Sequence, residues 1–136
     1  WIVYGIWMST RAVFDTRLFI EHYYSGDAGV LSRTKAEIRR VRKRFVSAVV
    51  LHEVYWLTLG CEGRDTAVLR ADLLEKDFRV VDVDAEIARV SAELRHKYRM
   101  RLADSIIAAT ALVLKAICLS DDPHLKGVKE IKTKWI

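Results

Sequence analysis

The chain contains no Asn and no Gln, two residue types that most proteins use. Lys and Arg together number 23, and Asp and Glu 18, in 136 residues. Loss of the heat-labile amides together with abundant charge is typical of thermophilic proteins, so we expect a thermophilic source. The same bias weakens a functional interpretation of surface charge, because ion-pair networks use these residues as well.

Cysteine and proline are also scarce, with two Cys and one Pro. Cys61 and Cys118 match no metal-ligand spacing, which argues against a cysteine-based zinc site. Cys118 lies in a strand-like apolar run and is expected to be a core residue. We expect no disulfide bridge, because we expect a cytoplasmic protein.

Long apolar runs are missing too. No stretch approaches the ~18 to 20 apolar residues that a bilayer span requires, so no membrane partner is expected. Residues 1–8 are apolar but lack the charged start and cleavage site of a signal peptide, and Met8 is a candidate native start. We interpret residues 1–8 as an extension of uncertain origin and residues 9–136 as a single domain.

Short apolar segments alternate with helical patterns along the rest of the chain. Strands are predicted at 12–14, 79–83 and 117–119, with an edge strand at 128–131. Helices are predicted at 16–24, 28–44, 48–59, 65–76, 85–98 and 102–116, with a turn or short helix from 122. This order predicts an α/β domain, in which helices cover both faces of a short parallel sheet. Ligands in such folds bind outside the carboxyl ends of the strands.

Four carboxylates stand beside or inside strongly apolar runs: Asp15, Glu53, Asp104 and Asp122. An isolated charge in such a place costs several kcal/mol or becomes neutral. If the four side chains converge, their repulsion adds to this cost, and a divalent cation relieves it. Oxygen-only ligands favour Mg²⁺ or Mn²⁺ over Zn²⁺.

Each acid also has a simpler explanation. Asp15, Asp104 and Asp122 stand at predicted helix starts, where Asp is a common capping residue. Glu53 lies within a predicted helix and caps nothing, so its alternative role is an ion pair with an Arg. Four independent accidents in one chain are improbable, and we therefore favour a shared metal site.

The segments around these acids resemble the PIN domain family. The resemblance runs from Arg11 to about Ile131 and rests on residues 13–16, 47–53, 102–111 and 119–122. Among PIN proteins, the VapC-type toxins are most similar in size; they are small ribonucleases that an antitoxin inhibits. The resemblance implies a three-layer α/β/α fold and a Mg²⁺- or Mn²⁺-dependent endoribonuclease.

The family pattern also implies roles for individual residues. The catalytic, metal-holding acids would be Asp15, Glu53, Asp104 and Asp122. Thr16 and Ser120 would hydrogen-bond a ligand or the scissile phosphate, with Ser120 standing where Thr is more usual. Asp121 is an extra carboxylate and an alternative or additional ligand. The resemblance further implies a homodimer and a protein antitoxin as partner.

The formal net charge of +5 favours anionic partners, nucleic acid first. Arg99 and Arg101 belong to the basic connector 95–101, which leads directly to Asp104, so we expect them to contact RNA phosphates. The denser basic run 39–44 is interpreted as an ion-paired helix face or as an RNA path. His124, close to Asp122, is a weaker candidate for substrate contact.

Two other functions remain open at this point. A PIN-like module that binds RNA or protein without cleaving it would keep the fold and lose turnover. An acid-site phosphotransferase of a different α/β family would need an Asp nucleophile with a suitably placed Lys, and the sequence gives no such signal.

Overall fold

The computed structural model describes residues 11–136, so the predictions for residues 1–8 lie outside the described part of the chain. Within that part, five strands form one parallel sheet in the order β3-β2-β1-β4-β5. The strands are β1 (Arg11–Phe14), β2 (Lys43–Ser47), β3 (Arg79–Val81), β4 (Ile117–Leu119) and β5 (Thr133–Lys134).

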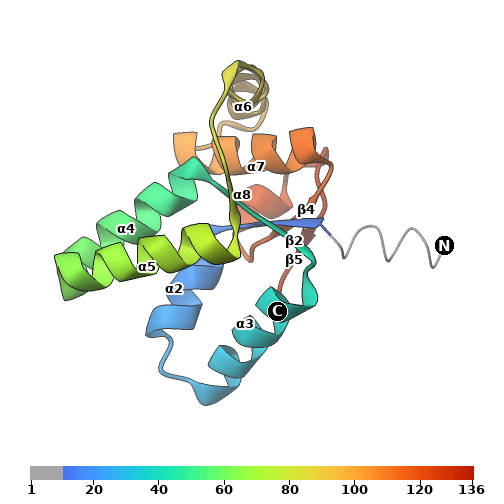
Figure 1. The fold of residues 1–136 in the computed structure, drawn as a ribbon. Helices are drawn as coiled ribbons and strands as arrows, with labels where there is room; N and C mark the ends of the chain where they lie inside the picture. Colours follow the sequence, from blue (N-terminus) through green and yellow to red (C-terminus); the bar gives the residue numbers. More distant parts are fainter. Residues whose placement is uncertain (1–10) are drawn as a thin grey trace.

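Helices cover both faces of this sheet, with α6 and α7 on one side and α2 and α3 on the other (Figure 1). The helices are α2 (Thr16–Tyr24), α3 (Ala28–Arg40), α4 (Ala48–Glu62), α5 (Arg64–Asp77), α6 (Ala85–Tyr98), α7 (Leu102–Leu114) and α8 (Pro123–Lys126). The predicted α/β class with a short parallel sheet is confirmed. Among the described residues, no helix is both long enough and apolar enough to cross a membrane.

The helix predicted at 28–44 is wrong in its last part. The helix α3 ends at Arg40, and Lys43–Ser47 form the strand β2, which lies between β1 and β3. Arg and Lys favour helices, and Val41 and Phe45 also fit helical spacing, so the local signal pointed to a helix. Pairing in the centre of the sheet, where Phe45 and Val46 are buried, overrides that preference.

Other boundaries differ by smaller amounts. The edge strand expected at 128–131 is instead Thr133–Lys134, which pairs with β4. The helix α4 continues to Glu62, where Gly63 ends it with a φ of 87° that suits glycine. Side chains cap the starts of α4 and α6: Ser47 Oγ accepts from the Val49 N–H at 3.2 Å, and Asp84 Oδ1 accepts from the Ile87 N–H at 2.9 Å.

The core lies between the sheet and the two helical layers. Phe14, Phe19 and Phe78 form an aromatic cluster, with the Phe14 and Phe78 ring centroids 5.0 Å apart. On the other face, the small side chains of α7 are fully buried and let that helix approach the strands closely. Cys118 is fully buried, as predicted for a core residue.

Candidate active site

The carboxyl ends of β1 and β4 bring two acidic segments together. Phe14 of β1 is paired with Leu119 of β4, and the Asp15 N–H donates to the Leu119 carbonyl oxygen at 3.1 Å. The residues that follow each strand therefore leave the sheet side by side. The first turn of α7, which carries Asp104, begins close to the same edge.

Asp15 is the most deeply buried acid of the group, with 3% of its surface exposed. Burial raises its pKa to about 6, while a hydrogen bond from Ser120 opposes that rise. The Ser120 hydroxyl donates to Asp15 Oδ2 at 2.6 Å. The charges of Asp104 and Asp122 raise the pKa of Asp15 further, so the three carboxylates are close enough to repel one another.

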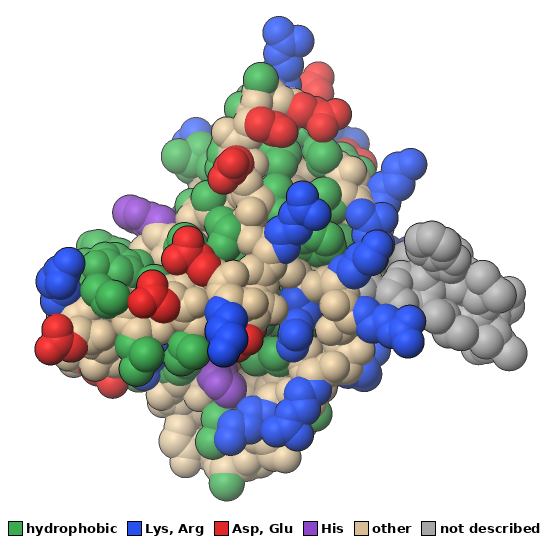
Figure 2. Space-filling model, in the orientation of Figure 1, with side chains coloured by type: hydrophobic (Ala, Val, Ile, Leu, Met, Phe, Trp, Pro, Cys, Tyr) green, Lys and Arg blue, Asp and Glu red, His purple; other side chains and the backbone are tan. Residues whose placement is uncertain are grey.

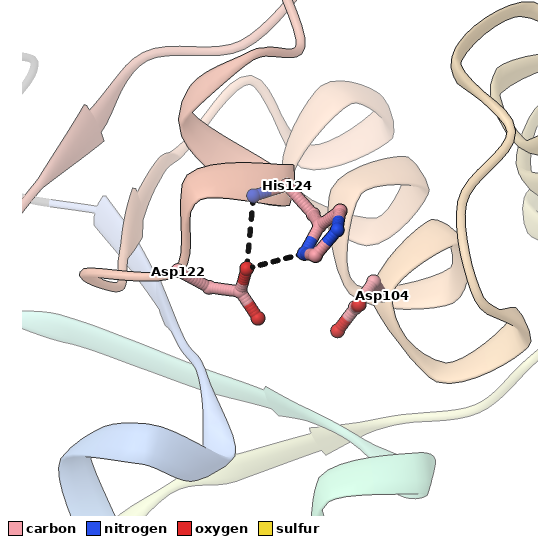
Figure 3. A group of neighbouring side chains, drawn as sticks. All are labelled: Asp104, Asp122 and His124. Atoms are coloured by element: carbon pink, nitrogen blue, oxygen red, sulfur yellow. Dashed lines mark hydrogen bonds and ion pairs between the residues drawn. The ribbon is translucent and has the colours of Figure 1, made fainter.

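Asp104, Asp122 and His124 form a compact group (Figure 3). One ligand atom from each of these residues lies within 4.8 Å of the others. Burial raises the pKa of Asp104, and the charge of Asp122 raises it further. Arg101 opposes this shift, with its Nε 3.4 Å from Asp104 Oδ2.

Ser120 connects the two halves of the acidic cluster, defined here as Asp15, Asp104 and Asp122. Its hydroxyl donates to Asp15 and accepts from the Asp122 N–H at 3.0 Å. Ser120 is fully buried, so this double hydrogen bond fixes Asp15 relative to the start of α8.

Glu53 approaches the site from the second turn of α4. The Thr16 hydroxyl donates to Glu53 Oε1 at 2.7 Å, and Thr16 directly follows Asp15. Glu53 is therefore hydrogen-bonded to a hydroxyl group, and not to an Arg as the alternative explanation expected. The hydroxyls of both Thr16 and Ser120 bond carboxylates, and their predicted contacts with substrate stay predictions.

The Asp121 carboxylate is paired with Arg17 and does not join the acidic cluster. Arg17 Nε donates to Asp121 Oδ1 at 3.1 Å, and a second guanidinium nitrogen donates to Oδ2 at 3.3 Å. This paired fork engages both oxygens of Asp121. The geometry therefore favours Asp122 over Asp121 as the acid that joins Asp104.

The capping explanation applies to one of the three aspartates. The Asp122 carboxylate accepts from the His124 N–H at 2.9 Å at the start of α8. Asp15 precedes α2 without a side-chain capping bond. Asp104 lies inside the first turn of α7, whose N-cap residue is Arg101. Capping therefore does not account for Asp15 or Asp104.

Of the two connector arginines, the structure brings one to the site. Arg101 lines an open pocket beside the acids, together with Arg17, Asp121, Asp122, Pro123 and His124. Its side chain is 77% exposed, with Nε paired with Asp104. Arg99 is exposed at the C-cap of α6, with a φ of 54°, and is not among the residues that line this pocket.

The basic run 39–44 lies at the opposite edge of the sheet. Arg40 is ion-paired with Glu37 at 2.7 Å, as expected for a helix face. The next three cations belong to a mainly basic cavity, which begins at the amino ends of the strands and runs along β3. Its charged lining residues are Arg11, Arg42, Lys43, Arg44, Lys76 and Arg79, together with Asp77, Asp82 and Asp84. Figure 2 shows Lys and Arg side chains gathered over this part of the surface.

Two residues near the acids were missed or undervalued in the sequence. Arg17 lies one position after Thr16, but nothing local indicates its ion pair with Asp121, 104 positions away. His124 lies two positions after Asp122, and the short helix α8 turns its ring back toward the carboxylate. The two-residue spacing between Asp122 and His124 was the one feature of the sequence that could have indicated a role for His124 at the site.

The donor set of this site fits a hard divalent cation. Two of the carboxylates have raised pKa values because they are buried near other negative charge. A cation reverses that penalty, and carboxylate oxygens are ligands for Mg²⁺ and Mn²⁺. The residues present are therefore compatible with such an ion.

The profile of the PIN domain family matches residues 12–131. The chain belongs to the PIN domain family. No functionally curated protein matches the sequence closely enough to count as a relative.

Among solved structures, 33 chains match. A chain of VapBC2 from Rickettsia felis, bound to a DNA fragment from its promoter, has a TM-score of 0.75 at 13% identity, covering 92% of this chain and 98% of that chain. A toxin-antitoxin complex from Klebsiella pneumoniae has a TM-score of 0.71 at 22% identity, with coverages of 92% and 99%. VapC20 of Mycobacterium tuberculosis, a toxin that cleaves the sarcin-ricin loop, has a TM-score of 0.67 at 24% identity, with coverages of 89% and 98%. At these identities the similarity establishes the fold.

Proposed function

We propose that this protein is a metal-dependent endoribonuclease that hydrolyses RNA phosphodiester bonds, and that it is the toxin of a toxin-antitoxin pair. One observation carries the proposal: Asp15, Asp104 and Asp122 gather at the carboxyl edge of a PIN-domain sheet, with the pKa of Asp15 raised to about 6. Such a site is unfavourable without a cation and suited to holding one.

The proposed roles follow from how each acid is held. Asp104 and Asp122 would be the main ligands of Mg²⁺ or Mn²⁺, and Asp15, oriented by Ser120, would complete the set. When bound, the ion lowers the pKa of water and neutralises charge that develops on the phosphate. Glu53, oriented by Thr16, would accept the proton of the attacking water. Water oxygen bonds to phosphorus, and the bond from phosphorus to the leaving ribose oxygen breaks.

Positive side chains would bring the polyanion to this negative site. Arg101 and Arg17 line the pocket beside Asp122, where they would contact phosphates on either side of the scissile bond. Arg17 also neutralises Asp121, which lowers the repulsion of substrate. We keep Arg99 as a proposed contact with a more distant phosphate, because it is exposed at the end of α6.

The test is cleavage of a generic single-stranded RNA with Mn²⁺ or Mg²⁺, with and without EDTA. We expect cleavage that requires the metal, and a loss of at least ~100-fold in Asp104→Asn, because metal stabilisation of charge is worth several kcal/mol. Asp72→Asn, an exposed Asp of α5, is the matched control and should retain activity.

The outcomes separate the alternatives. Metal-independent cleavage, or full activity in Asp104→Asn, would contradict the proposed site. RNA binding without cleavage would support the inactive binding module instead. Asp121→Asn decides between the two adjacent acids: we expect activity close to wild type, since Asp121 is paired with Arg17.

Two partners belong to the proposal. The structural neighbours include VapBC and other toxin-antitoxin complexes, which supports a protein antitoxin for this chain. We also propose a homodimer and a cytoplasmic location, where RNA substrates occur. Co-expression with the product of an adjacent small gene should suppress both toxicity and cleavage, and light scattering should give twice the 15.7 kDa chain mass.

A further inference from the structure

We propose that His124 supplies an imidazole nitrogen to the metal centre and makes that centre favour Mn²⁺ over Mg²⁺. The inference rests on the proposed function, because it assumes that Asp104 and Asp122 hold a divalent ion. It adds a ligand of a different chemical type to an otherwise all-oxygen site.

The His124 ring lies beside the two carboxylates of Asp104 and Asp122. His124 Nδ1 lies 3.0 Å from Asp122 Oδ1, and the group that includes Asp104 fits within 4.8 Å. In octahedral coordination with metal–ligand distances of ~2.1 Å, adjacent ligand atoms lie about 3.0 Å from each other. The contact is a hydrogen bond without an ion, and a cation that displaces the proton from Nδ1 can bind the ring and the carboxylate together without a change in their spacing. Figure 3 shows the three side chains pointing into one common space.

The backbone at the start of α8 holds His124 close to Asp122. Pro123 occupies the first turn of α8, and the His124 N–H donates to Asp122 Oδ1 at 2.9 Å. These contacts fix the first turn of α8, which carries His124, next to Asp122. The His124 side chain is also 63% exposed, so an ion that enters from the open pocket meets the ring directly.

Mg²⁺ and Mn²⁺ differ in how much they gain from a nitrogen ligand. Mg²⁺ takes oxygen ligands and gives up its water reluctantly, so an added nitrogen contributes little to its binding. Imidazole is a ligand for first-row transition ions, and Mn²⁺, although the weakest binder of that series, belongs to it whereas Mg²⁺ does not. A site with two Asp and one His should therefore prefer Mn²⁺, whereas the same site without His124 should lose most of that preference.

The other three histidines provide controls. His22 bonds the Thr34 hydroxyl at 2.9 Å on the α2–α3 side of the sheet. His52 of α4 and His96 of α6 are exposed and lie outside the pocket beside Asp122. His96→Ala is the matched control for His124→Ala, because both changes remove an exposed imidazole.

The direct test is pulsed electron paramagnetic resonance of Mn²⁺ bound to the full-length protein. We expect modulation from one imidazole nitrogen in the wild type and in His96→Ala, and its loss in His124→Ala. Mn²⁺ bound in the wild type without nitrogen modulation would overturn the inference.

A binding titration gives the second measurement. The affinity for Mn²⁺ should fall by at least about tenfold in His124→Ala and in His124→Asn, which keeps a hydrogen-bond donor near Asp122. The affinity for Mg²⁺, measured by competition, should change much less. Equal losses for both ions would contradict a nitrogen ligand and point to a role in orienting Asp122.

Failure of this inference differs from failure of the proposed function. If Asp104→Asn abolishes Mn²⁺ binding and cleavage while the wild type shows no nitrogen modulation, the nuclease stands and His124 is not a ligand. If the wild type binds no Mn²⁺ and cleaves no RNA, both proposals fall together.

Discussion

The two edges of the parallel sheet carry opposite charge and hold it in different ways. At the carboxyl edge, the acidic cluster is largely buried and fixed by short hydrogen bonds, such as Ser120 to Asp15 at 2.6 Å. At the amino edge, six Lys and Arg line the basic cavity beside three Asp, and several of the cations, such as Arg42 and Lys43, are exposed. The carboxyl edge therefore holds its negative charges at defined positions, whereas the positive charges of the amino edge are spread over a wider surface.

This difference matters for how each edge can bind. Buried carboxylates at fixed positions destabilise the protein until a cation reaches them, so they suit one ion in one place. Flexible exposed cations attract any polyanion and lose that attraction as salt rises. The Lys and Arg residues of the second edge contribute to the net charge of +5, and the chemistry that we propose belongs to the first edge.

The largest expected effect at the acidic edge is on stability and its dependence on pH. Burial raises the pKa of Asp15 to about 6 from an ordinary value of 3.8. The folded protein therefore holds this proton more tightly than the unfolded chain, so stability falls as pH rises from about 4 through 6. The contribution is up to about 3 kcal/mol.

Asp15→Asn should remove this penalty, since Asn can still accept from Ser120. In EDTA at pH 8, the variant should be more stable to urea than the wild type, by up to about 3 kcal/mol. The difference should shrink toward pH 4 and in saturating Mn²⁺. Equal stability of the wild type and Asp15→Asn at pH 8 in EDTA would contradict the described difference between the two edges. Asp72→Asn is the control for a general effect of removing a negative charge.

The second effect concerns the basic cavity. We expect the double variant Arg42→Glu, Lys43→Glu to weaken RNA binding and to reduce the slope of log affinity against log salt by about 2. Arg64→Glu, Arg89→Glu makes the same change of charge on exposed helix positions outside the cavity. Binding is measured in the Asp104→Asn background, which prevents cleavage. Equal weakening by both pairs would leave the amino edge with no special role.

The smallest effect tests Arg99. This residue and Lys115 both end a helix with a left-handed φ, 54° and 51°. Replacement of either by Gly should stabilise the protein by about 1 kcal/mol, because Gly adopts this conformation without strain. If Arg99→Gly also weakens RNA binding and Lys115→Gly does not, Arg99 contacts phosphate. Unchanged binding in both would limit the role of the connector to Arg101.

Local sequence patterns predicted the parts of the fold where one signal was strong. The strands before Asp15 and Asp122, and the helix that carries Asp104, follow from apolar runs next to a single acid. The strand β2 was missed because its basic first half favours a helix and only pairing with β1 and β3 reveals it. Its position in the sheet depends on contacts that no short segment contains.

The candidate site shows the same limit. The four acids could be selected because each was unusual in its own surroundings. Their partners could not be selected locally, because Thr16 meets Glu53 across 37 positions and Ser120 meets Asp15 across 105. The family resemblance linked the acids in order, and the structure supplied the contacts of Asp121 and His124.

The most direct test of the central claim is a crystal structure of the protein soaked with Mn²⁺, with the ion located by its anomalous scattering. We predict an Mn²⁺ site at the carboxyl edge of the sheet, coordinated by Asp104 and Asp122, at distances of about 2.2 Å. Mn²⁺ located elsewhere, or carboxylates that stay too far apart to share the ion, would contradict the account.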